Sequence, residues 1–553
     1  MSINRLRLLF ALLVVVALGT ATGTARDQWV IRDQAYDVDT LIFPHLVGPG
    51  VTAAKYDLPA LPLKVSVTEI DLTNPHIALE TCMGADRTWG VETPVQMATR
   101  KTWPGHEVVA AVNGDFFITS SIFEIGIPLS GQVSNGELLE STHNCVCLVM
   151  DDDNHPYIDR LNFTGQITCG DNTFPLNLVN RMRYYVEDIA ANQSVLFTNA
   201  FGPITYNGSA TGKMVLLRPA DSEFRWKPNG EEMCVVDSVF DAQGLKTIPE
   251  GKAILWLKGT FADHAAAMSE GDVLSISFRL TFNNEPGDVE IHQLMGSSGE
   301  IIMQNGEFID DWNELHPRTA VGFNADSTRL YFVVVDGRQE TSVGATLKDM
   351  MGIFVALGAA NAMNMDGGGS SCMVVNDEVI NSPSDGQVRP VGNGCLVVST
   401  APVDDQISII GFEPGCYNIP NSAITSFGVW GYNRYGVLKT REVAGCTFSC
   451  DPQVGFFAAD GTFHAARVPA SGKLYVSCGN ITASQHVTIV KAPIKGDVND
   501  DGIVNIEDVI ELIDSILNNA PYSSTADVNG DGRISISDVT GVIDILLYLD
   551  HAL

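Results

Sequence analysis

Polar residues end or interrupt several apolar runs before residue 400, in VVAAVNGDFF, HPRTAVGF, FVVVDGRQ and NAMNMDGGGSSCMVV, and SPSDGQVRPVGNG follows. Taken singly, each cluster is more often a glycine turn with a capping Asp. Together they place several carboxylates and guanidinium groups at the ends of strands, where such groups are costly unless they pair or bind something. The clusters therefore indicate one shared site for chemistry on a polar substrate.

The run from Asp366 to Ser371 combines a carboxylate, three glycines and two hydroxyls. Exposed backbone N–H groups beside a carboxylate suit an anionic oxygen next to a reacting carbon. The run is not a Walker loop, because no Lys follows the glycines, and it is not a nucleophile elbow of the G-x-S-x-G kind. Cys372, which comes next, is expected to be a buried packing residue rather than a nucleophile.

The order N-G-x-F-F, P-R-T-A-V-G, D-G-R, N-x-D-G-G-G-S-S and R-P-V resembles the phosphodiester glycosidase family over roughly Val51 to Thr400. The resemblance implies hydrolysis of a sugar joined through its anomeric carbon to a phosphodiester, as in N-acetylglucosamine-1-phosphodiesters. The products would be the free sugar and a phosphomonoester. The sugar itself stays open, because loops such as 207–212 show no shared motif.

The leaving group suggests roles for the charged residues. A departing phosphate has a second pKa of about 6, so Arg can replace much of the work of a catalytic acid. Arg318 and Arg389 are predicted to bind the phosphate, and Asp366 is predicted to face the anomeric carbon or its attacking water. Asp336 and Asp115 compete for that role, and a turn cap is the other interpretation of Asp336. The predicted substrate-binding residues are Asn113, Gly114, His316, Asn364, Gly367, Gly368, Gly369, Ser370 and Ser371.

The elements that must position these residues are strands and at least one helix. Alternating patterns predict strands at 63–71 and 330–335. Thr346 and Asp349 form a capping pair for a helix that stops at Gly358. Its expected buried side holds Leu347, Met351, Phe354 and Leu357. An α+β catalytic domain over 26–402 follows.

Residues 403–492 have short β-patterned runs broken by Gly, Asn and Pro, which predicts an Ig-like β-sandwich acting as a spacer. The eleven Cys of the chain show no paired C-x-x-C spacing, so a structural zinc is not expected. Cys446 or Cys450 with Cys478 could form a disulfide after export.

Residues 494–553 contain two copies of a calcium-loop pattern, DVNDDGIVNIED and DVNGDGRISISD. Such loops place oxygen ligands at positions one, three, five, seven, nine and twelve. The predicted ligands are Asp497, Asn499, Asp501, the carbonyl of Ile503, Asn505 and Asp508, then Asp527, Asn529, Asp531, the carbonyl of Arg533, Ser535 and Asp538. Asp at position twelve is typical of dockerins, which the segment resembles, so two bound Ca²⁺ ions and a cohesin partner are implied.

Each loop leads into an apolar helix, and the two helices are expected to pack as a pair. The expected packing residues are Val509, Ile513, Ile516 and Leu517 in the first helix, and Val539, Val542, Ile543 and Leu546 in the second. A segment this small has little core, so calcium binding and folding should be coupled.

Residues 1–25 have the pattern of a signal peptide, with Arg5 and Arg7 before an apolar run. Secretion to the extracellular space or the cell surface is therefore expected, with no membrane span. A formal net charge of −33 argues against a nucleic-acid partner. Two alternatives to the main hypothesis stay open, namely a hydrolase of ordinary glycosidic bonds in polysaccharides and a non-catalytic carbohydrate-binding or assembly protein.

Overall fold

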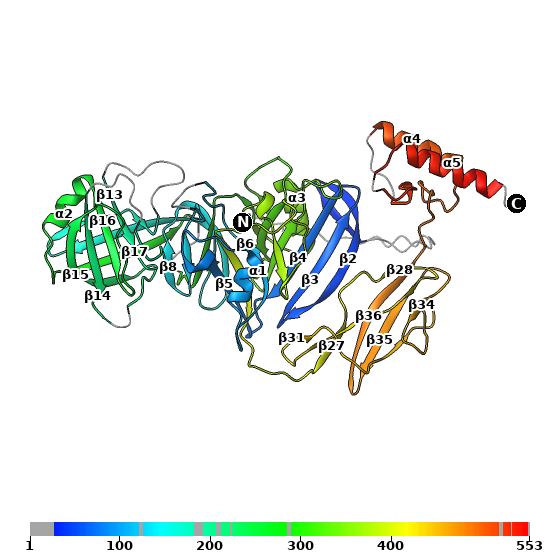
Figure 1. Ribbon diagram of the computed structural model, residues 1–553, viewed down its shortest axis with the longest axis horizontal. Coiled ribbons are helices and arrows are strands. Elements are labelled where there is room, and N and C mark those ends of the chain that lie inside the picture. Colours follow the sequence, from blue (N-terminus) through cyan, green and yellow to red (C-terminus); the bar gives the residue numbers. More distant parts are fainter. Residues whose placement is uncertain are drawn as a thin grey trace, which may run out of the picture.

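The computed structural model describes residues 27–120, 125–181, 192–205, 212–221, 224–284, 289–518, 524–531 and 533–550. The predicted signal peptide lies outside these ranges, as does most of the loop 207–212. The molecule is elongated, with a lobe of β-strands at one end and the helix pair α4 (Ile506–Asn518) and α5 (Ile536–Asp550) at the other (Figure 1). Within the described ranges, no helix is long and apolar enough to cross a membrane.

A nine-stranded sheet forms one half of the centre of the molecule. Its strands, in spatial order, are β1 (Asp27–Ile31), β2 (Gln34–Gly48), β3 (Val51–Leu58), β4 (Leu63–Asp71), β22 (Arg329–Val335), β21 (Arg318–Phe323), β23 (Asn361–Asn364), β19 (Ile301–Gln304) and β20 (Glu307–Phe308). β4 confirms the strand predicted at 63–71, and β22 contains the one predicted at 330–335. Strands far apart in sequence thus end side by side.

A five-stranded sheet packs against the nine-stranded one. Its strands, in spatial order, are β25 (Glu378–Val379), β24 (Met373–Val375), β6 (Glu107–Asn113), β26 (Asn393–Ser399) and β5 (Ile77–Met83). Buried side chains from both sheets, such as Phe332 and Val397, share one core. The short helix α1 (Pro94–Arg100) covers the outer face of the smaller sheet, where Cys372 is buried as a packing residue.

Helix α3 (Leu347–Leu357) covers the outer face of the nine-stranded sheet. Its ends confirm the prediction, because Thr346 and Asp349 form the capping box and Gly358 ends the helix at φ 88°. The buried face is rotated from the one expected. Leu347, Met350, Ile353 and Phe354 are fully buried, whereas Met351 and Leu357 are only partly buried.

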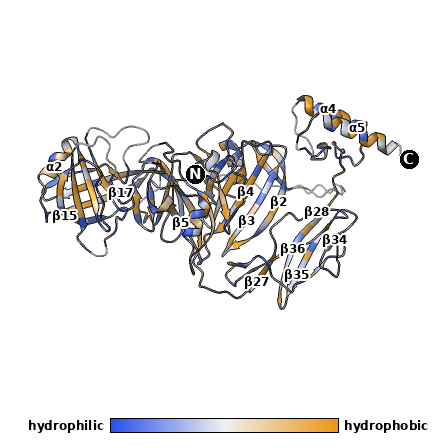
Figure 2. Ribbon diagram, in the orientation of Figure 1, coloured by the Kyte–Doolittle hydropathy of each residue, from blue (hydrophilic) through white to orange (hydrophobic). Residues whose placement is uncertain are grey.

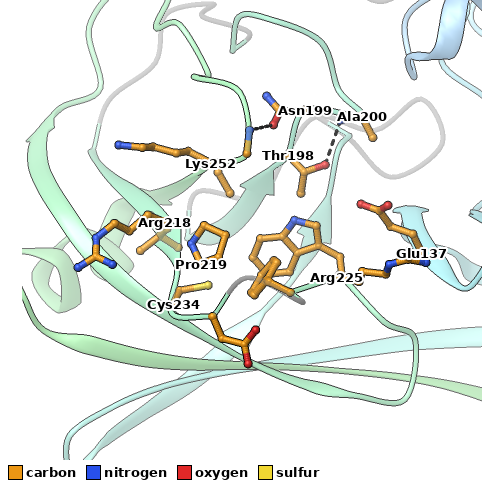
Figure 3. A pocket seen from close by; sticks show the side chains of 15 residues that line it. Glu137, Thr198, Asn199, Ala200, Arg218, Pro219, Arg225, Cys234 and Lys252 are labelled. Carbon is orange, nitrogen blue, oxygen red and sulfur yellow. Dashed lines mark hydrogen bonds between the residues drawn. The ribbon is translucent and has the colours of Figure 1, made fainter.

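A twelve-stranded sheet extends from the centre into the β-lobe, which we define as the strands between residues 156 and 282. The sheet contains β12 (Leu178–Val179), β13 (Gln193–Phe197), β16 (Ala253–Lys258), β14 (Lys213–Pro219), β15 (Glu231–Asp241), β17 (Val273–Phe282), β10 (Pro156–Cys169), β9 (His143–Met150), β18 (Gln293–Ser297), β7 (Gln132–Ser134), β8 (Glu137–Glu140) and β11 (Asn172–Leu176). Figure 2 shows hydrophobic residues along these strands. A cavity opens beside the lobe (Figure 3).

The expectation of an α+β domain over 26–402 needs correction, because the described part of this region is dominated by strands. Its helices are α1, α2 (Ala262–Ala266) and α3, and α2 has only 5 residues. The physical reason is visible in strands such as β17, where buried and exposed residues alternate as a two-residue period requires. Among the helices described in this region, α3 with 11 residues is the longest.

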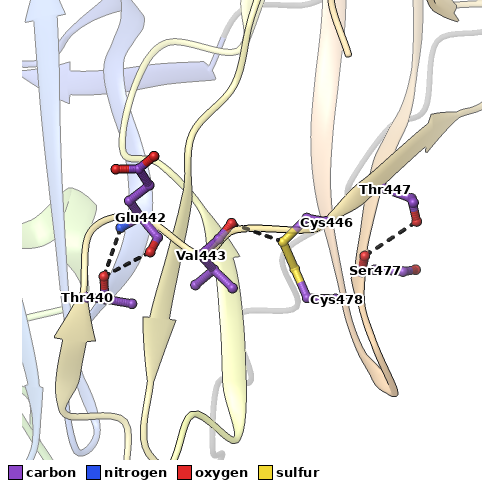
Figure 4. Close-up of a disulfide and its surroundings, with 7 residues drawn as sticks. All are labelled: Thr440, Glu442, Val443, Cys446, Thr447, Ser477 and Cys478. Carbon is purple, nitrogen blue, oxygen red and sulfur yellow. Dashed lines mark hydrogen bonds between the residues drawn. A yellow bond between two sulfur atoms is a disulfide. The ribbon is translucent and has the colours of Figure 1, made fainter. Parts of the chain in front are cut away.

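Three small sheets follow between residues 409 and 490 and enclose one apolar core. They are β27 (Ile409–Phe412), β30 (Val429–Tyr432) and β31 (Leu438–Thr440); β28 (Asn418–Pro420), β36 (Ile481–Val490), β35 (Ala470–Cys478) and β32 (Thr447–Cys450); and β29 (Ile424–Thr425), β34 (Phe463–Ala465) and β33 (Gly455–Phe457). Of the two disulfides predicted as alternatives, the pair Cys446–Cys478 forms (Figure 4).

Helix α4 packs against α5 around a small core. Val509, Val539 and Val542 are buried in that core as predicted, and Ile516 and Leu546 pack against it. The prediction was wrong for Ile513, Leu517 and Ile543, which are exposed, and Leu512 and Ile545 pack in the core in their place. Leu517 has 75% of its surface exposed, so part of the apolar pattern faces solvent.

Candidate active site

The predicted site residues gather at the ends of strands of the two central sheets, and Asn113 joins these ends. Its Nδ2 donates to the carbonyl of Asp366 over 2.7 Å, while its Oδ1 accepts from the Thr319 hydroxyl and the Cys372 N–H. The side chain is fully buried. Through these bonds Asn113 connects β6, β21 and the glycine-rich turn. Both ends of its side-chain amide are therefore hydrogen-bonded within the protein.

Asp366 sits at the entrance of the glycine-rich turn, after β23. Its N–H donates to the carbonyl of Gly114 over 3.0 Å, and its side chain is 9% exposed. Burial raises the pKa of Asp366 to about 7, against the opposing effects of the Ser370 hydroxyl and the Arg389 guanidinium. A carboxyl with this pKa can take up and release a proton near neutral pH.

Two guanidinium groups lie against the glycine-rich turn. A Cβ on Gly368 would lie 3.0 Å from Nη2 of Arg338, and one on Gly369 would lie 2.1 Å from Nη2 of Arg389. Gly368 also has φ +62°, a conformation that favours glycine. The glycines therefore allow two cations to approach the backbone closely.

Arg389 is linked to Asp366 through one hydroxyl. Its Nη1 donates to Ser370 Oγ over 3.3 Å, and the same hydroxyl bonds to the Asp366 carboxylate. Asp385 holds the other side of the guanidinium, with Nε and Nη2 at 3.0 and 2.6 Å from its Oδ2. The Arg389 side chain is 37% exposed, so a ligand can reach it.

The amides of the turn are mostly engaged. The Gly368 N–H donates to the carbonyl of Pro317, and the Gly367 N–H bonds to the Asp366 carboxylate. The Ser370 and Ser371 N–H groups donate within the turn. This leaves the guanidinium groups, more than the backbone, to meet an anion.

Asp115 lies behind Asp366. Its two carboxylate oxygens accept the N–H groups of Ser130 and Ser298 over 2.6 and 2.7 Å, and its own N–H donates to Asn393 Oδ1. Burial, with a smaller contribution from the charge of Asp366, raises the pKa of Asp115 to about 7. With both oxygens bonded to main chain and 1% exposure, Asp115 braces the site from within.

Arg318 is 1% exposed and points to the side of the sheet covered by α3. Its Nε and Nη2 donate to the carbonyls of Ala345 and Glu314, and its guanidinium stacks on Trp312 at 4.3 Å. The charge of Glu300 acts on it as well. This geometry favours a positioning role for Arg318 over the phosphate-binding role expected from the sequence.

Asn364 lies beside that group, and its Nδ2 donates to Glu300 Oε2 over 3.3 Å. Burial raises the pKa of Glu300, which is partly exposed. Among the contacts of the described residues, the buried Oδ1 of Asn364 has no hydrogen-bond partner. Asn364 thus presents an unused oxygen at the end of β23, beside Glu300.

Asp336 is engaged in holding a loop. Its Oδ1 accepts the Ser382 N–H over 2.8 Å and the Asn381 side chain, and Lys55 Nζ lies 3.9 Å from its Oδ2. Burial raises the pKa of this carboxyl. His316 is separate from this group, because its Nε2 pairs with Glu314 at the surface over 3.0 Å.

The two calcium-type loops near the C-terminus share one hydrogen-bond pattern. Asp508 accepts the N–H groups of residues 498, 499 and 505, and Asp538 accepts those of residues 528, 529 and 535. In the first loop, Asp497 is 1% exposed and its Oδ1 has no hydrogen-bond partner among the described residues. A buried, unpartnered carboxylate oxygen fits a hard cation.

Comparison with known proteins matches two segments of the chain to known families. Residues 229–398 match the model of the phosphodiester glycosidase family, and residues 495–547 match that of the dockerin type I domain. The chain carries a phosphodiester glycosidase domain and a dockerin domain. The glycosidase match includes Arg318, Asp366 and Arg389, whereas Asn113 and Asp115 precede it.

Two curated proteins are similar over short stretches. The SPbeta prophage-derived uncharacterized protein YomE of Bacillus subtilis (strain 168) is 46% identical over 81 residues, 15% of this chain and 12% of YomE. The N-acetylglucosamine-1-phosphodiester alpha-N-acetylglucosaminidase of Bos taurus is 32% identical over 99 residues, 18% of each chain. The chain thus spans less than a fifth of either relative.

A solved structure supports the fold. The crystal structure of a hypothetical protein from Synechocystis aligns with a TM-score of 0.50 at 18% identity, covering 63% of this chain and 62% of that one. At this level of identity the likeness concerns the fold alone.

Three residues without a predicted role, Arg338, Glu300 and Ser298, contact the predicted site residues. Arg338 stands in the D-G-R motif, which was noted without a role for its Arg. Ser298 and Glu300 belong to GSSGE after β18, where another apolar run ends in polar residues. The same rule that found the other clusters could have found this one.

Proposed function

We propose that the glycosidase domain hydrolyses the bond between the anomeric carbon of a sugar and a phosphodiester. The observation that carries this proposal is the series of hydrogen bonds that runs from Arg389 through Ser370 to Asp366 on the glycine-rich turn. It puts a guanidinium, which suits phosphate, one hydroxyl away from a carboxyl with a pKa of about 7. Substrates of the N-acetylglucosamine-1-phosphodiester type are the first to test.

In this mechanism Arg389 and Arg338 hold the phosphate and stabilise the charge that develops as it leaves. Charge stabilisation of this kind suffices because phosphate is already a good leaving group. Ser370 orients a phosphate oxygen. Asp366 in its ionised form removes a proton from the water that attacks the anomeric carbon.

The other predicted residues take supporting parts in the proposal. Asn113, Asp115 and Asp336 hold the strand ends and the loop that carries Arg389. Arg318 keeps Glu300 in place, and Glu300 with Asn364 orients sugar hydroxyls. The turn is shaped by Gly114, Gly367 to Gly369 and Ser371. His316, which pairs with Glu314 at the surface, lies at the outer edge of the site.

We also propose that the protein is secreted and tethered through its dockerin. The twelve predicted loop ligands would hold two Ca²⁺ ions, which would stabilise the fold of the dockerin. Exposed apolar side chains on α4 and α5, among them Ile510, Leu517 and Leu547, support docking to a cohesin module. The sandwich between residues 403 and 492 would act as an Ig-like spacer.

A substrate screen with a matched variant tests the proposed activity. The full chain is incubated with sugar-1-phosphodiesters and with the corresponding phosphate-free glycosides, and released sugar is measured. We expect cleavage of phosphodiesters alone, abolished in Asp366→Asn. Equal cleavage of the phosphate-free glycosides would favour a hydrolase of ordinary glycosidic bonds instead.

A further inference from the structure

Two adjoining cavities form a cleft between the β-lobe and the five-stranded sheet. One has a volume of about 360 Å³ and the other about 550 Å³. Glu137, Ala200, Phe224 and Arg225 line both, so these residues mark the point where the cavities meet. A cleft with two such compartments is long enough for more than one sugar unit.

The inner end of this cleft lies near the candidate active site. Met83 lines the larger cavity and pairs with Asn393 on the neighbouring strand. Asn393 in turn accepts the N–H of Asp115. Strands are spaced about 4.8 Å apart, so the step from β5 across β26 to β6 is about 10 Å. The larger cavity therefore lies about two strand spacings from the residues that back Asp366.

The cleft contains an aromatic wall. Phe224 is partly exposed and meets the buried ring of Trp226 edge-on, with centroids 4.5 Å apart. Trp226 is fixed in the lobe core beside Phe278 at 5.8 Å. Figure 3 shows the side chains that line this cavity, with Glu137 and Arg225 next to each other. A supported aromatic ring offers an apolar face to the C–H groups of a sugar.

The cations around the cleft have acidic neighbours. Arg218 and Lys252 both pair with Asp237, at 3.0 and 2.6 Å. Lys101 pairs with Asp86 at 2.8 Å, and the charge of Arg225 acts on Glu137. Cations that already contact carboxylates bind a further anion weakly, and these groups together supply many donors and acceptors for hydroxyl groups. Within the described residues, no glycine-rich turn adjoins them as it does Arg338 and Arg389.

We propose that this cleft is a subsite for a neutral oligosaccharide, with Phe224 as its stacking surface and Arg225 and Glu137 as its hydroxyl-binding pair. The link of this subsite to catalysis rests on the proposed function, and it makes the substrate a phosphodiester that carries an extended glycan. The binding itself does not depend on turnover.

Binding is measured with the full chain on an array of immobilised neutral hexasaccharides in gluco-, manno- and galacto-configuration, with inorganic phosphate in solution as a competitor. We expect at least one hexasaccharide to bind, and Arg225→Ala and Phe224→Ala each to weaken it about tenfold or more. Lys227→Ala removes a neighbouring exposed cation outside the lining and should leave binding unchanged. Thermal unfolding of each variant confirms that the lobe is folded.

Several results would overturn the subsite. These are no binding to any hexasaccharide, binding that is indifferent to Arg225→Ala and Phe224→Ala in folded variants, and binding displaced by millimolar phosphate, which would indicate an anion site. A chain that binds hexasaccharides in this way but cleaves no phosphodiester would contradict the proposed function and leave the subsite standing. The two proposals therefore fail separately.

Discussion

The glycine-rich turn of the glycosidase domain and the calcium-type loops of the dockerin use the same residue types for different work. Between described residues, the side-chain hydrogen bonds of Asp, Asn and Ser in each loop reach at most 10 residues along the chain, as from Asp508 to Val498. In the turn, the contacts come from distant segments, and Asn113 reaches Asp366 across 253 residues. The loops are thus folded by local sequence, whereas the turn is positioned by the sheets.

A second difference is the state of the carboxylates. Burial raises the pKa of Asp366 and Asp115 to about 7, because its effect outweighs the hydrogen bonds to both carboxyls and the charge of Arg389 near Asp366. Asp497 is also buried, but one of its oxygens has no hydrogen-bond partner among the described residues, as is expected of a metal ligand. The site around the glycine-rich turn therefore contains a carboxyl that can exchange a proton, and the first calcium-type loop contains one that can bind a cation.

The largest effect is expected from Asp366→Asn, which removes the exchangeable proton without changing the size of the side chain. We expect kcat on every phosphodiester substrate to fall a thousandfold or more, about 4 kcal/mol of transition-state stabilisation. Thermal unfolding should stay close to that of the wild type. A folded variant within tenfold of wild type would move the role to another carboxyl, with Glu300 as the first to test.

Asn113→Ala tests whether the turn depends on distant support. The substitution leaves the Thr319 hydroxyl, the Cys372 N–H and the Asp366 carbonyl without their buried partner. We expect the free energy of unfolding to fall by about 3 kcal/mol, measured by urea titration. Asn113→Asp retains the acceptor but places an oxygen against the Asp366 carbonyl, so it should lose less only at low pH, where the new carboxyl is protonated and can donate. Unchanged stability with raised KM would return Asn113 to a substrate-binding role.

Arg389→Ala should weaken the hold on the phosphate. We expect kcat/KM to fall about a hundredfold on alkyl phosphodiesters and clearly less on aryl phosphodiesters, whose leaving phosphate needs less charge stabilisation. Arg318→Ala is the matched comparison, because its guanidinium is buried against carbonyls and Trp312 and should affect thermal stability instead. A large loss of kcat/KM in Arg318→Ala, with only a loss of stability in Arg389→Ala, would return the phosphate-binding role to Arg318.

The pH dependence follows from the pKa of about 7 for Asp366, which the Arg389 charge lowers and burial raises. As a base, Asp366 must be ionised, so kcat should rise about tenfold per pH unit below 7 and level off above it. Stability should move in the opposite direction. The Asp366 carboxyl keeps its proton up to a higher pH in the folded protein than in the unfolded chain. Its contribution to the free energy of unfolding is therefore fully present below about pH 4 and is lost as the pH rises to 7. A rate that falls above pH 7 would make Asp366 an acid.

Calcium removal should have the smallest effect on catalysis. We expect hydrogen exchange after about Lys495 to increase strongly in chelator, while hydrolysis by the same sample changes less than twofold, because the loops contribute no residue to the turn. Unchanged exchange would contradict the coupling of calcium to folding. Loss of activity would show that the glycosidase domain needs a metal of its own.

The same contrast explains what could be predicted from the sequence. The caps of α3 and the two loops were predictable because Thr346, Gly358 and the loop ligands act on neighbours in the chain. The side of the sheet that Arg318 faces could not be predicted, since it depends on the position of α3 and Trp312. The β-lobe was missed as a separate unit, because its alternating strands look like those of the central sheets.

The central claim is that water attacks the anomeric carbon and the C–O bond breaks. Hydrolysis of a glucosaminyl phosphodiester by the full chain in H₂¹⁸O, followed by ³¹P NMR, tests this claim directly. The account predicts an unlabelled phosphomonoester, because its four oxygens all come from the substrate, together with the free sugar. Release of an ¹⁸O-labelled phosphate or of a sugar 1-phosphate would show attack at phosphorus and contradict it.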